Sequence, residues 1–379
     1  MLNFIRTLDC LIGRFVYLFL RIRRAVQEPP SPESLTIRKI LCIKLWGLGN
    51  LVVVSPLLSA IKKRFSEAEL IFLTFDLNRG FLERNAAVGR VVYFKYTKNF
   101  FFILCRFIAC TIRFRRERID IVVNFETFNN ASALFSCLTK APLRLGISNG
   151  YEAPLYTHPF RSDQSEHISQ TFMHLLTPLC GPGRYSYFDF PRLEKEKEAV
   201  TGLLARYGIN RFVCIHPGTS DNFKGKRYRK EYLSELAGLI IRRHGAQVVF
   251  TGTGEERELA GEIMEMMAQA DNVFNVAGEL SIWEFIELLR RSHVFISSDS
   301  GPVHIAASLG INTAVFYGPT SPARYGPFNK NSLVFYNGIA CSPCVATGYV
   351  NRDCRNRFRC LDFDPKEIFR QISERYFHD

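Results

Sequence analysis

The stretch Val294–Pro319, VFISSDSGPVHIAASLGINTAVFYGP, contains the pattern of a strand, a loop, a helix and a second strand. Its first residues are β-branched and aromatic, which is typical of a buried strand. Residues 297–302 are types that turn the chain and cap a helix N-terminus. A helix is predicted over 303–309, Gly310 ends it, and 313–316 form the next strand. Because a helix N-terminus favours an anion, this unit predicts a phosphate site.

Two further glycine-containing loops follow predicted buried strands. The sequence HPGTS at 216–220 comes after the apolar run 212–215, and WGLGN at 46–50 comes after the run 40–45. Strands that alternate with helices predict an α/β protein with parallel sheets. Ligands of such sheets bind at the carboxyl ends of the strands, where all three loops are expected.

Length and charge limit the class of protein. At 379 residues the chain is too long for one average domain, and 47% hydrophobic residues suffice for two cores. Lys and Arg number 49 against 36 Asp and Glu, a net charge of +13. This balance favours anionic partners such as nucleotide phosphates or an anionic membrane surface. No nucleic-acid partner is expected, because the chain has no zinc finger, recognition motif or long basic block.

Two segments combine apolar and basic residues. Residues 1–27 carry apolar side chains at helical spacing and arginines on the opposite face, which predicts an amphipathic helix in a membrane interface. Arg14 interrupts the apolar run, so a transmembrane span is not expected. A signal peptide is not expected either, because no small-residue cleavage site follows the apolar run. Residues 99–118 place phenylalanines before arginines and suggest a second lipid-facing surface. For both segments the alternative is a helix packed on the protein itself.

The three loops together resemble the glycosyltransferase family that includes the ADP-heptose:lipopolysaccharide heptosyltransferases, glycosyltransferase family 9. The resemblance covers roughly residues 37–375 and rests on 46–50, on 216–228, and on Asp299-Ser300-Gly301 with His304 and the later YGPT at 317–320. It implies the GT-B architecture of two facing Rossmann-like domains with a cleft between them. The implied divisions are an amphipathic helix and linker at 1–36, an acceptor domain at 37–190, and a nucleotide-sugar donor domain with a cysteine-rich tail at 191–379.

The resemblance also implies roles on the donor side. Lys226 would neutralise charge on the leaving diphosphate, with Lys224 and Arg227 as neighbouring alternatives. A glutamate after the turn at 252–254 would bind the ribose hydroxyls, and Glu255 is preferred over Glu256 for its closeness to the turn. Asp299 is expected on sugar hydroxyls, since a carboxylate repels phosphate. The remaining predicted donor-binding residues are Thr219, Ser220, Ser300, Gly301 and His304.

The acceptor loop departs from the family pattern. The family usually carries an aspartate, thought to be the general base, where this chain has Asn50 after Gly47 and Gly49. A carboxamide accepts no proton near neutral pH, so the base is expected elsewhere. Glu126 is the first candidate and Asp76 the second, since each follows a predicted strand.

Four late cysteines have the spacing Cys341-x2-Cys344-x9-Cys354-x5-Cys360. This pattern is compatible with a structural zinc ion or an iron–sulfur cluster, and equally with free thiols or disulfides. None of the predicted donor loops contains an Asp-x-Asp motif, so no catalytic metal or other cofactor is expected.

The sequence thus predicts an inverting glycosyltransferase that moves a sugar, heptose from ADP-heptose by resemblance, onto a lipopolysaccharide-type glycolipid. The expected location is cytoplasmic and peripheral, at the inner membrane. Two alternatives stay open: a non-catalytic nucleotide-sugar-binding module, favoured by Asn50, and a membrane-associated scaffold of envelope assembly, favoured by residues 1–27.

Overall fold

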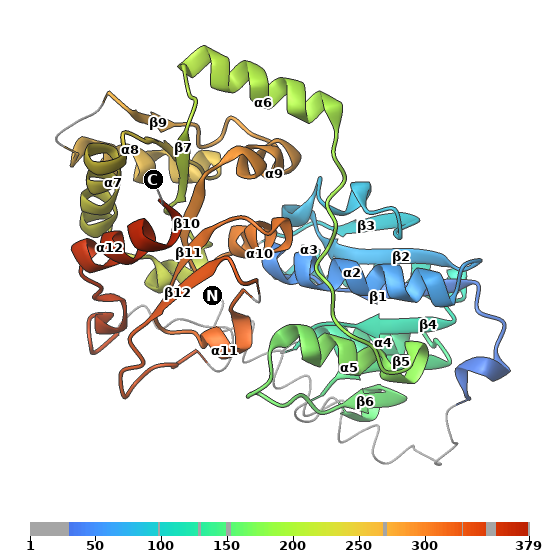
Figure 1. The fold of residues 1–379 in the computed structure, drawn as a ribbon. Coiled ribbons are helices and arrows are strands. Elements are labelled where there is room, and N and C mark those ends of the chain that lie inside the picture. The colour runs from blue at the N-terminus through green and yellow to red at the C-terminus, as the bar shows by residue number, and fades with distance from the viewer. Residues whose placement is uncertain are drawn as a thin grey trace. The chain divides into compact units, whose positions relative to one another are not determined.

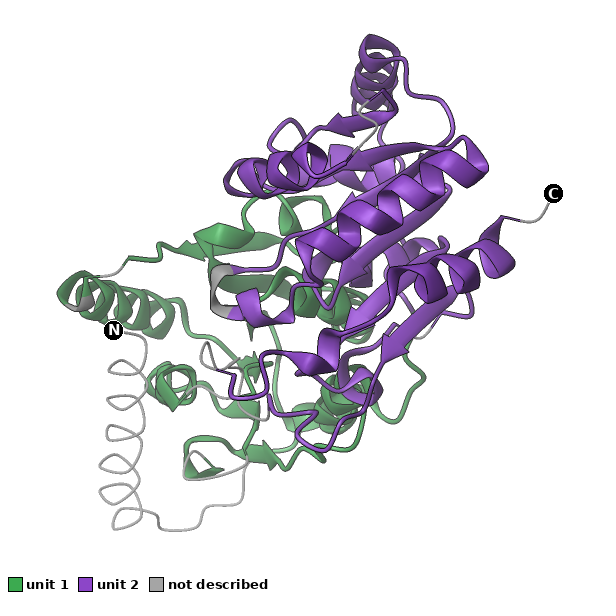
Figure 2. Cartoon of the chain, turned by 90° about the vertical axis from the view of Figure 1, so that its left-hand side faces the viewer, with its two compact units in different colours: residues 1–186 green, residues 187–379 purple. Residues whose placement is uncertain are grey.

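The computed structural model of the protein describes residues 30–97, 99–127, 130–148, 153–267, 271–327, 329–345 and 354–377. The amphipathic helix predicted for residues 1–27 lies outside these ranges. The chain divides into two compact units, Met1–Ser186 and Tyr187–Asp379 (Figure 2). Over the residues described, no helix is both long enough and apolar enough to cross a bilayer.

The first unit is built on a six-stranded parallel sheet with the strand order β3-β2-β1-β4-β5-β6 (Figure 1). Its strands are β1 Lys39–Ile43, β2 Glu69–Phe75, β3 Arg90–Phe94, β4 Ile121–Asn124, β5 Leu143–Ile147 and β6 His158–Phe160. The central strands are apolar along their whole length because helices cover both faces of such a sheet. This order reverses between β1 and β4, and ligands bind at such a reversal.

Helices connect the strands of this unit: α2 Leu48–Arg64, α3 Phe100–Glu117, α4 Asn130–Leu138 and α5 Ile168–Cys180. The sequence predicts strands of this unit at 40–45, 70–74, 91–94 and 119–124, and all four form with small shifts at their ends. The sequence shows no clear periodic pattern over residues 126–190, which nevertheless contain α4, α5, β5 and β6. The short β6 and the proline inside α5 explain why simple periodicity does not detect them.

The second unit repeats the same sheet with the order β12-β11-β10-β7-β8-β9, in which all paired strands are parallel. Its strands are β7 Phe212–His216, β8 Gln247–Phe250, β9 Val273–Asn275, β10 Val294–Ser298, β11 Thr313–Tyr317 and β12 Ser332–Tyr336. The reversal lies between β7 and β10. These are the strands that precede the HPGTS loop and the SSDSG loop.

The helices of the second unit are α6 Glu194–Tyr207, α7 Lys230–His244, α8 Arg257–Glu265, α9 Ile282–Arg291, α10 Gly301–Leu309, α11 Pro322–Tyr325 and α12 Pro365–Tyr376. The sequence predicts helices over 230–244 and 365–376, and α7 and α12 confirm both predictions at both ends. Ser281 with Glu284 three residues later predicts a capping box, and α9 confirms it: each side chain bonds to the other residue's backbone N–H. Gly310 ends α10 at φ 71°, a conformation that suits glycine.

Candidate active site

The two loops at the strand reversal of the second unit start side by side. In the parallel register Ser297 of β10 pairs with His216 of β7. The Ser297 hydroxyl donates a hydrogen bond to the His216 carbonyl over 3.1 Å, which ties the two strand ends together. The structure therefore places the HPGTS and SSDSG loops at one edge of one sheet, as the sequence predicts.

Helix α10 begins directly after this edge, with Ser300 as its N-cap residue. The Ser300 side chain makes no capping bond to the first turn and lies 3.0 Å from the Ser297 hydroxyl instead. The first N–H groups of a helix have no partner within the helix. The start of α10 at Gly301 thus offers backbone donors and the positive end of a helix dipole to an anion.

Lys226 and Asp299 form an ion pair at the same place. Lys226 Nζ lies 2.7 Å from Asp299 Oδ2, and the hydroxyl of Thr320 donates to that same oxygen over 2.6 Å. Burial alone would raise the pKa of Asp299, but the Lys226 ammonium and the two hydrogen bonds outweigh it and hold that pKa below its ordinary value. Asp299 is therefore an anion that holds a cation at the edge of the sheet.

The backbone around Lys226 explains how a loop lysine reaches β10. The N–H of Tyr228 donates to the Ser298 hydroxyl over 2.8 Å, so the segment that carries Lys226 is fastened to the end of β10. The guanidinium of Arg227 donates to the Thr219 carbonyl over 2.9 Å and braces the HPGTS loop. Lys226 is the predicted cation that pairs with Asp299, whereas Lys224 lies exposed on the loop.

The remaining predicted donor residues divide by exposure. Thr219 is buried and its hydroxyl donates to the carbonyl of Phe223, while Ser220 is exposed. His304 lies in the first turns of α10, close enough to Asp299 and Lys226 to interact electrostatically with both. Burial lowers the pKa of His304, which therefore presents a neutral imidazole at pH 7.

The preference for Glu255 over Glu256 is not supported by the geometry. Glu255 is exposed, whereas Glu256 accepts a hydrogen bond from the Thr253 N–H over 2.8 Å and lies 3.9 Å from His216 Nε2. A Cβ atom on Gly218 would lie 1.7 Å from the Glu256 carboxylate. Glu256 therefore packs against the HPGTS loop, because the turn at 252–254 begins a capped helical turn that directs position 256 inward.

The acceptor loop of the first unit is held by Glu126. Its carboxylate lies 2.9 Å from Lys44 Nζ and accepts hydrogen bonds from the backbone N–H groups of Leu45 and Trp46. Glu126 is 6% exposed and Lys44 is 2% exposed, so the pair is buried. Both oxygens of Glu126 are engaged, and the side chain fixes the loop after β1.

The glycines and Asn50 lie where that loop becomes α2. Gly47 is the N-cap residue at φ 86°, and a Cβ atom there would lie 3.3 Å from the Asn50 amide nitrogen. Gly49 is buried in the first turn of α2. Asn50 thus folds its carboxamide back over Gly47, in the position where a carboxylate was expected from the family.

Asp76 follows β2, the neighbour of β1, and is partly exposed. Its Oδ1 accepts a hydrogen bond from the Tyr96 N–H over 2.9 Å, and the described residues place no bond on its Oδ2. Trp46 of the acceptor loop packs its ring edge-on against Phe75, with 4.6 Å between ring centroids. Asp76 therefore follows directly after Phe75, the residue that contacts Trp46 of the acceptor loop.

The four late cysteines are free thiols: Cys341 and Cys344 are exposed, Cys354 is partly exposed, and Cys360 is buried. The amide of Asn356 donates to Cys341 Sγ, and the Phe358 N–H donates to Cys354 Sγ. Within the described ranges, no three His, Cys, Asp or Glu side chains form a group that could hold a metal ion. The described residues thus offer no ligand set for the predicted structural zinc or iron–sulfur cluster.

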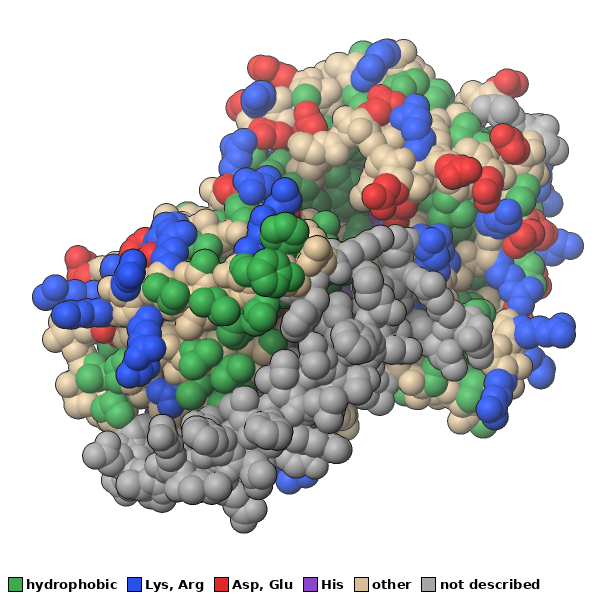
Figure 3. Space-filling view, turned by 180° about the vertical axis from the view of Figure 1, so that it is seen from behind, with side chains coloured by type: hydrophobic (Ala, Val, Ile, Leu, Met, Phe, Trp, Pro, Cys, Tyr) green, Lys and Arg blue, Asp and Glu red, His purple; other side chains and the backbone are tan. Residues whose placement is uncertain are grey.

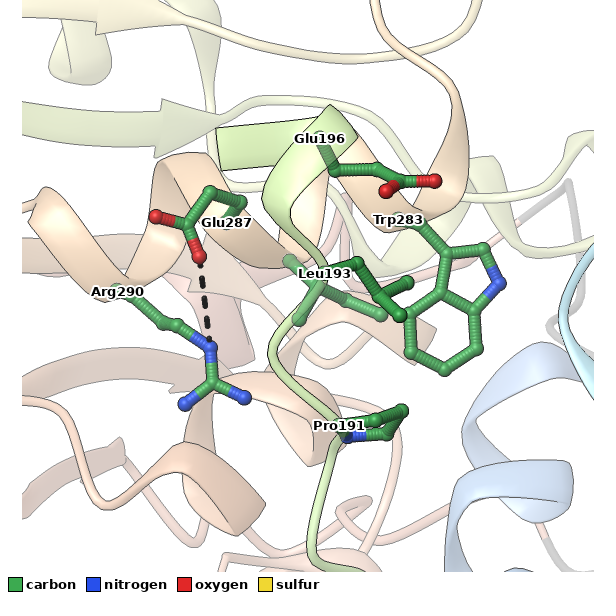
Figure 4. Close-up of a pocket in the computed structure, with 7 residues that line it drawn as sticks. Pro191, Leu193, Glu196, Trp283, Glu287 and Arg290 are labelled. Carbon is green, nitrogen blue, oxygen red and sulfur yellow. Dashed lines mark ion pairs between the residues drawn. The ribbon is translucent and has the colours of Figure 1, made fainter. Parts of the chain in front are cut away.

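A shallow pocket in the second unit lies between α9 and the segment that enters α6 (Figure 4). Trp283, Glu287 and Arg290 of α9 line it, together with Pro191 and other residues of that segment. Its roughly 180 Å³ fall below the size of usual ligand pockets, about 300 Å³ or more. The Arg290 guanidinium already has partners within the protein: its Nε lies 3.7 Å from Glu287 Oε2, and its Nη2 donates a hydrogen bond to the Phe190 carbonyl.

Comparison with known proteins identifies the family. Residues 109–353 match the profile of "Glycosyltransferase family 9 (heptosyltransferase)", more than half of the chain. The protein belongs to this family and is a glycosyltransferase.

Individual relatives are distant but cover most of the chain. Lipooligosaccharide heptosyltransferase 2 of Campylobacter jejuni is 21% identical over 339 residues, 86% of this chain and 94% of that protein. The structure of E. coli ADP-heptose lipopolysaccharide heptosyltransferase II has a TM-score of 0.71 at 20% identity, covering 89% of this chain and 98% of its own. E. coli heptosyltransferase WaaC, solved with ADP, has a TM-score of 0.59 at 18% identity, covering 78% and 92%. The predicted GT-B class is confirmed.

Proposed function

We propose that this glycosyltransferase moves a heptose from ADP-heptose onto a lipopolysaccharide-type glycolipid, with inversion at the anomeric carbon. Membership of family 9 supports a sugar-transfer reaction. The names of the relatives, a lipooligosaccharide heptosyltransferase and an ADP-heptose enzyme, support the choice of heptose, ADP and glycolipid. The observation that carries the proposal is the ion pair of Lys226 with Asp299 at the start of α10.

The pair suits a site for a leaving diphosphate. A carboxylate that shares one oxygen between Lys226 and Thr320 keeps the ammonium in place before any ligand arrives, so little reorganisation is needed when charge develops. The first N–H groups of α10 add backbone donors beside it. In this proposal Lys226 and the residues 300–301 face the diphosphate, and Asp299 holds Lys226 rather than sugar hydroxyls.

The reaction is a single displacement. The acceptor hydroxyl oxygen forms a bond to the anomeric carbon while the bond from that carbon to the β-phosphate oxygen breaks. The electron pair leaves on ADP, where Lys226 neutralises it, and the hydroxyl proton passes to a base. One displacement on the face opposite the leaving group inverts the configuration.

Asp76 is our proposed base, with Glu126 as a positioning residue. The support is the contrast between the two carboxylates: Glu126 is buried and fully engaged, whereas Asp76 is partly exposed beside the acceptor loop. Asn50 lies in the same loop and would orient the acceptor through its carboxamide. Glu256, which lies beside Gly218, is our proposed ribose contact in place of Glu255.

The test is transfer by the full chain from ADP-heptose to a heptose-free lipopolysaccharide core acceptor. We expect ADP release that depends on acceptor, and a product whose anomeric configuration by NMR is opposite to that of the donor. UDP- and GDP-sugars are the control donors, and we expect no product from them. Retention of configuration would exclude the single displacement, and a product from UDP-sugars alone would exclude the ADP donor.

A nucleotide-sugar-binding module is the second candidate, favoured by Asn50 in place of a carboxylate. It predicts that ADP-heptose raises the melting temperature of the chain while ADP release stays at the uncatalysed rate. A scaffold would show neither effect. The proposal includes a peripheral position at the cytoplasmic face of the inner membrane, supported by the net charge of +13 and by the glycolipid acceptor.

A further inference from the structure

Helix α3 of the first unit has apolar side chains on its outer side as well as its inner side. The inner side packs on the sheet through Phe114, which is fully buried, and through Phe107 and Thr111. Large apolar side chains on the outer side are exposed: Phe101 66%, Phe102 56%, Leu104 42%, Ile108 49% and Ile112 46%. A surface helix normally presents polar residues to water, so the fold by itself does not explain this outer side.

The exposed apolar residues are concentrated on this helix. Where burial is described, the other large exposed hydrophobic side chains are scattered singly: Leu77, Leu138, Met266 and Val334. Single exposed apolar residues are normal on soluble proteins, whereas a contiguous apolar patch marks an interaction site. We call the five exposed residues of α3 the apolar face.

Arginines continue the apolar face toward the end of the helix. Arg113, Arg115, Arg116 and Arg118 are all exposed. The one acidic residue of α3, Glu117, is paired with Arg90 and with Arg113, so it leaves the surface basic. Figure 3 shows hydrophobic side chains beside Lys and Arg side chains on this side of the protein.

Charge decides between the possible occupants of this surface. The segment 1–27 contains Arg6, Arg14, Arg21 and two further arginines but a single acid, Asp9. A second copy of α3 would likewise bring arginines against arginines. Both occupants are disfavoured by like charge, whereas an anionic bilayer offers apolar tails and phosphate groups to the two halves of the surface.

We propose that the apolar face of α3 and its exposed arginines dock on an anionic lipid bilayer. The phenylalanines and isoleucines enter the region between headgroups and acyl chains, and Arg115 and Arg116 bind lipid phosphates. The inference rests on the proposed function, because it brings the acceptor domain to the surface that holds a glycolipid acceptor.

The test is sedimentation of the full chain with phosphatidylcholine vesicles, with and without roughly one-third phosphatidylglycerol. F101S/F102S should bind the anionic vesicles at least about tenfold more weakly, because two apolar side chains no longer insert. L77S is the matched control, since Leu77 is as exposed but lies off the helix. R115E/R116E should weaken binding by a similar factor, and R242E/R243E on the exposed end of α7 should not.

Three results would overturn the inference. Unchanged vesicle binding by both α3 variants excludes α3 as the docking surface. A lower melting temperature of F101S/F102S with unchanged binding means that residues 1–27 cover the face instead. Loss of a dimer in sedimentation velocity with unchanged binding means that a second copy covers it.

Activity separates this inference from the proposed function. Transfer to a deacylated, water-soluble acceptor should be the same in F101S/F102S as in the natural chain, while transfer to acceptor embedded in vesicles should fall. If neither protein transfers to the soluble acceptor, the proposed function fails and the vesicle result still stands by itself.

Discussion

Lys226 is the residue on which the proposed chemistry depends most. It is held by Asp299 at 2.7 Å, whereas Lys224, two residues earlier, is exposed. Lys226→Ala should lower kcat by roughly 10²-fold or more, the effect of losing one preorganised charge, and Lys224→Ala should leave it unchanged. Acceptor-dependent ADP release measures both variants. Equal rates in Lys226→Ala and the natural chain would remove Lys226 from the mechanism.

Thr320 belongs to the YGPT motif at 317–320, although the motif did not mark it as a site residue. Its hydroxyl donates to the oxygen of Asp299 that also binds Lys226. Hydrogen bonds to charged groups contribute about 1.5–3 kcal/mol, so Thr320→Val should lower kcat and raise the pKa of Asp299. Thr320→Ser keeps the hydroxyl, so kcat and the pKa of Asp299 should both stay near their natural values. A pH profile of kcat measures both quantities in each variant. A profile that is identical in valine and serine variants would mean that Thr320 is only structural.

At the scale of elements, Glu126 and Asp76 differ in their contacts around the loop from β1 to α2, although both were candidates for the base. Asp76→Asn should abolish transfer, because loss of proton acceptance typically costs about 10²- to 10⁴-fold in rate, while affinity for ADP stays the same. Glu126→Gln should instead lower the melting temperature, since it leaves Lys44 buried without its charge partner. Transfer rates, ADP affinities and melting curves of both variants test this.

Asn50→Asp completes that experiment. It restores a carboxylate beside Gly47, so transfer should be unchanged or faster. Full activity in Asp76→Asn together with loss of transfer in a folded Glu126→Gln would return the role of base to Glu126. Activity that exists only in Asn50→Asp would make the natural chain a binding module.

The packing of the HPGTS loop on the turn before α8 gives a second element-scale prediction. A methyl group on Gly218 would lie 1.7 Å from the Glu256 carboxylate, which the Thr253 N–H holds in place. Gly218→Ala should cost about 1–3 kcal/mol in the free energy of unfolding. Gly254→Ala meets no atom within 4 Å and is the control. In a Glu256→Ala background the cost should shrink; an equal cost there would mean that Glu256 is not the obstacle.

For the whole molecule, the prediction concerns residues 1–27. If they lie in the membrane interface, their deletion should leave a folded enzyme with weaker binding to anionic vesicles and the same transfer to a water-soluble acceptor. High salt should weaken binding of the full chain more than of the shortened one, because five arginines are lost. Collapse of the fold, seen in melting curves, would show that the segment is core structure.

Several elements could be predicted from the sequence because their signals are local. The strand at 294–298, the ends of α7 and α12 and the capping box of α9 depend on apolar runs and on residues a few positions apart. Helix α6 and strand β12 were missed, because a helix rich in Glu and Lys and a half-exposed edge strand have weak periodicity.

The sequence alone determined the fold class and the position of the three loops, since strand periodicity and glycine turns act within a few residues. Tertiary structure decided the partners of charged groups. It paired Glu126 with Lys44 across 82 positions, put Glu256 rather than Glu255 against Gly218, and joined Lys226 to Asp299 and Thr320. Such pairs form between the ends of neighbouring strands, and the order of strands in a sheet depends on the packing of the whole domain, which no local pattern contains.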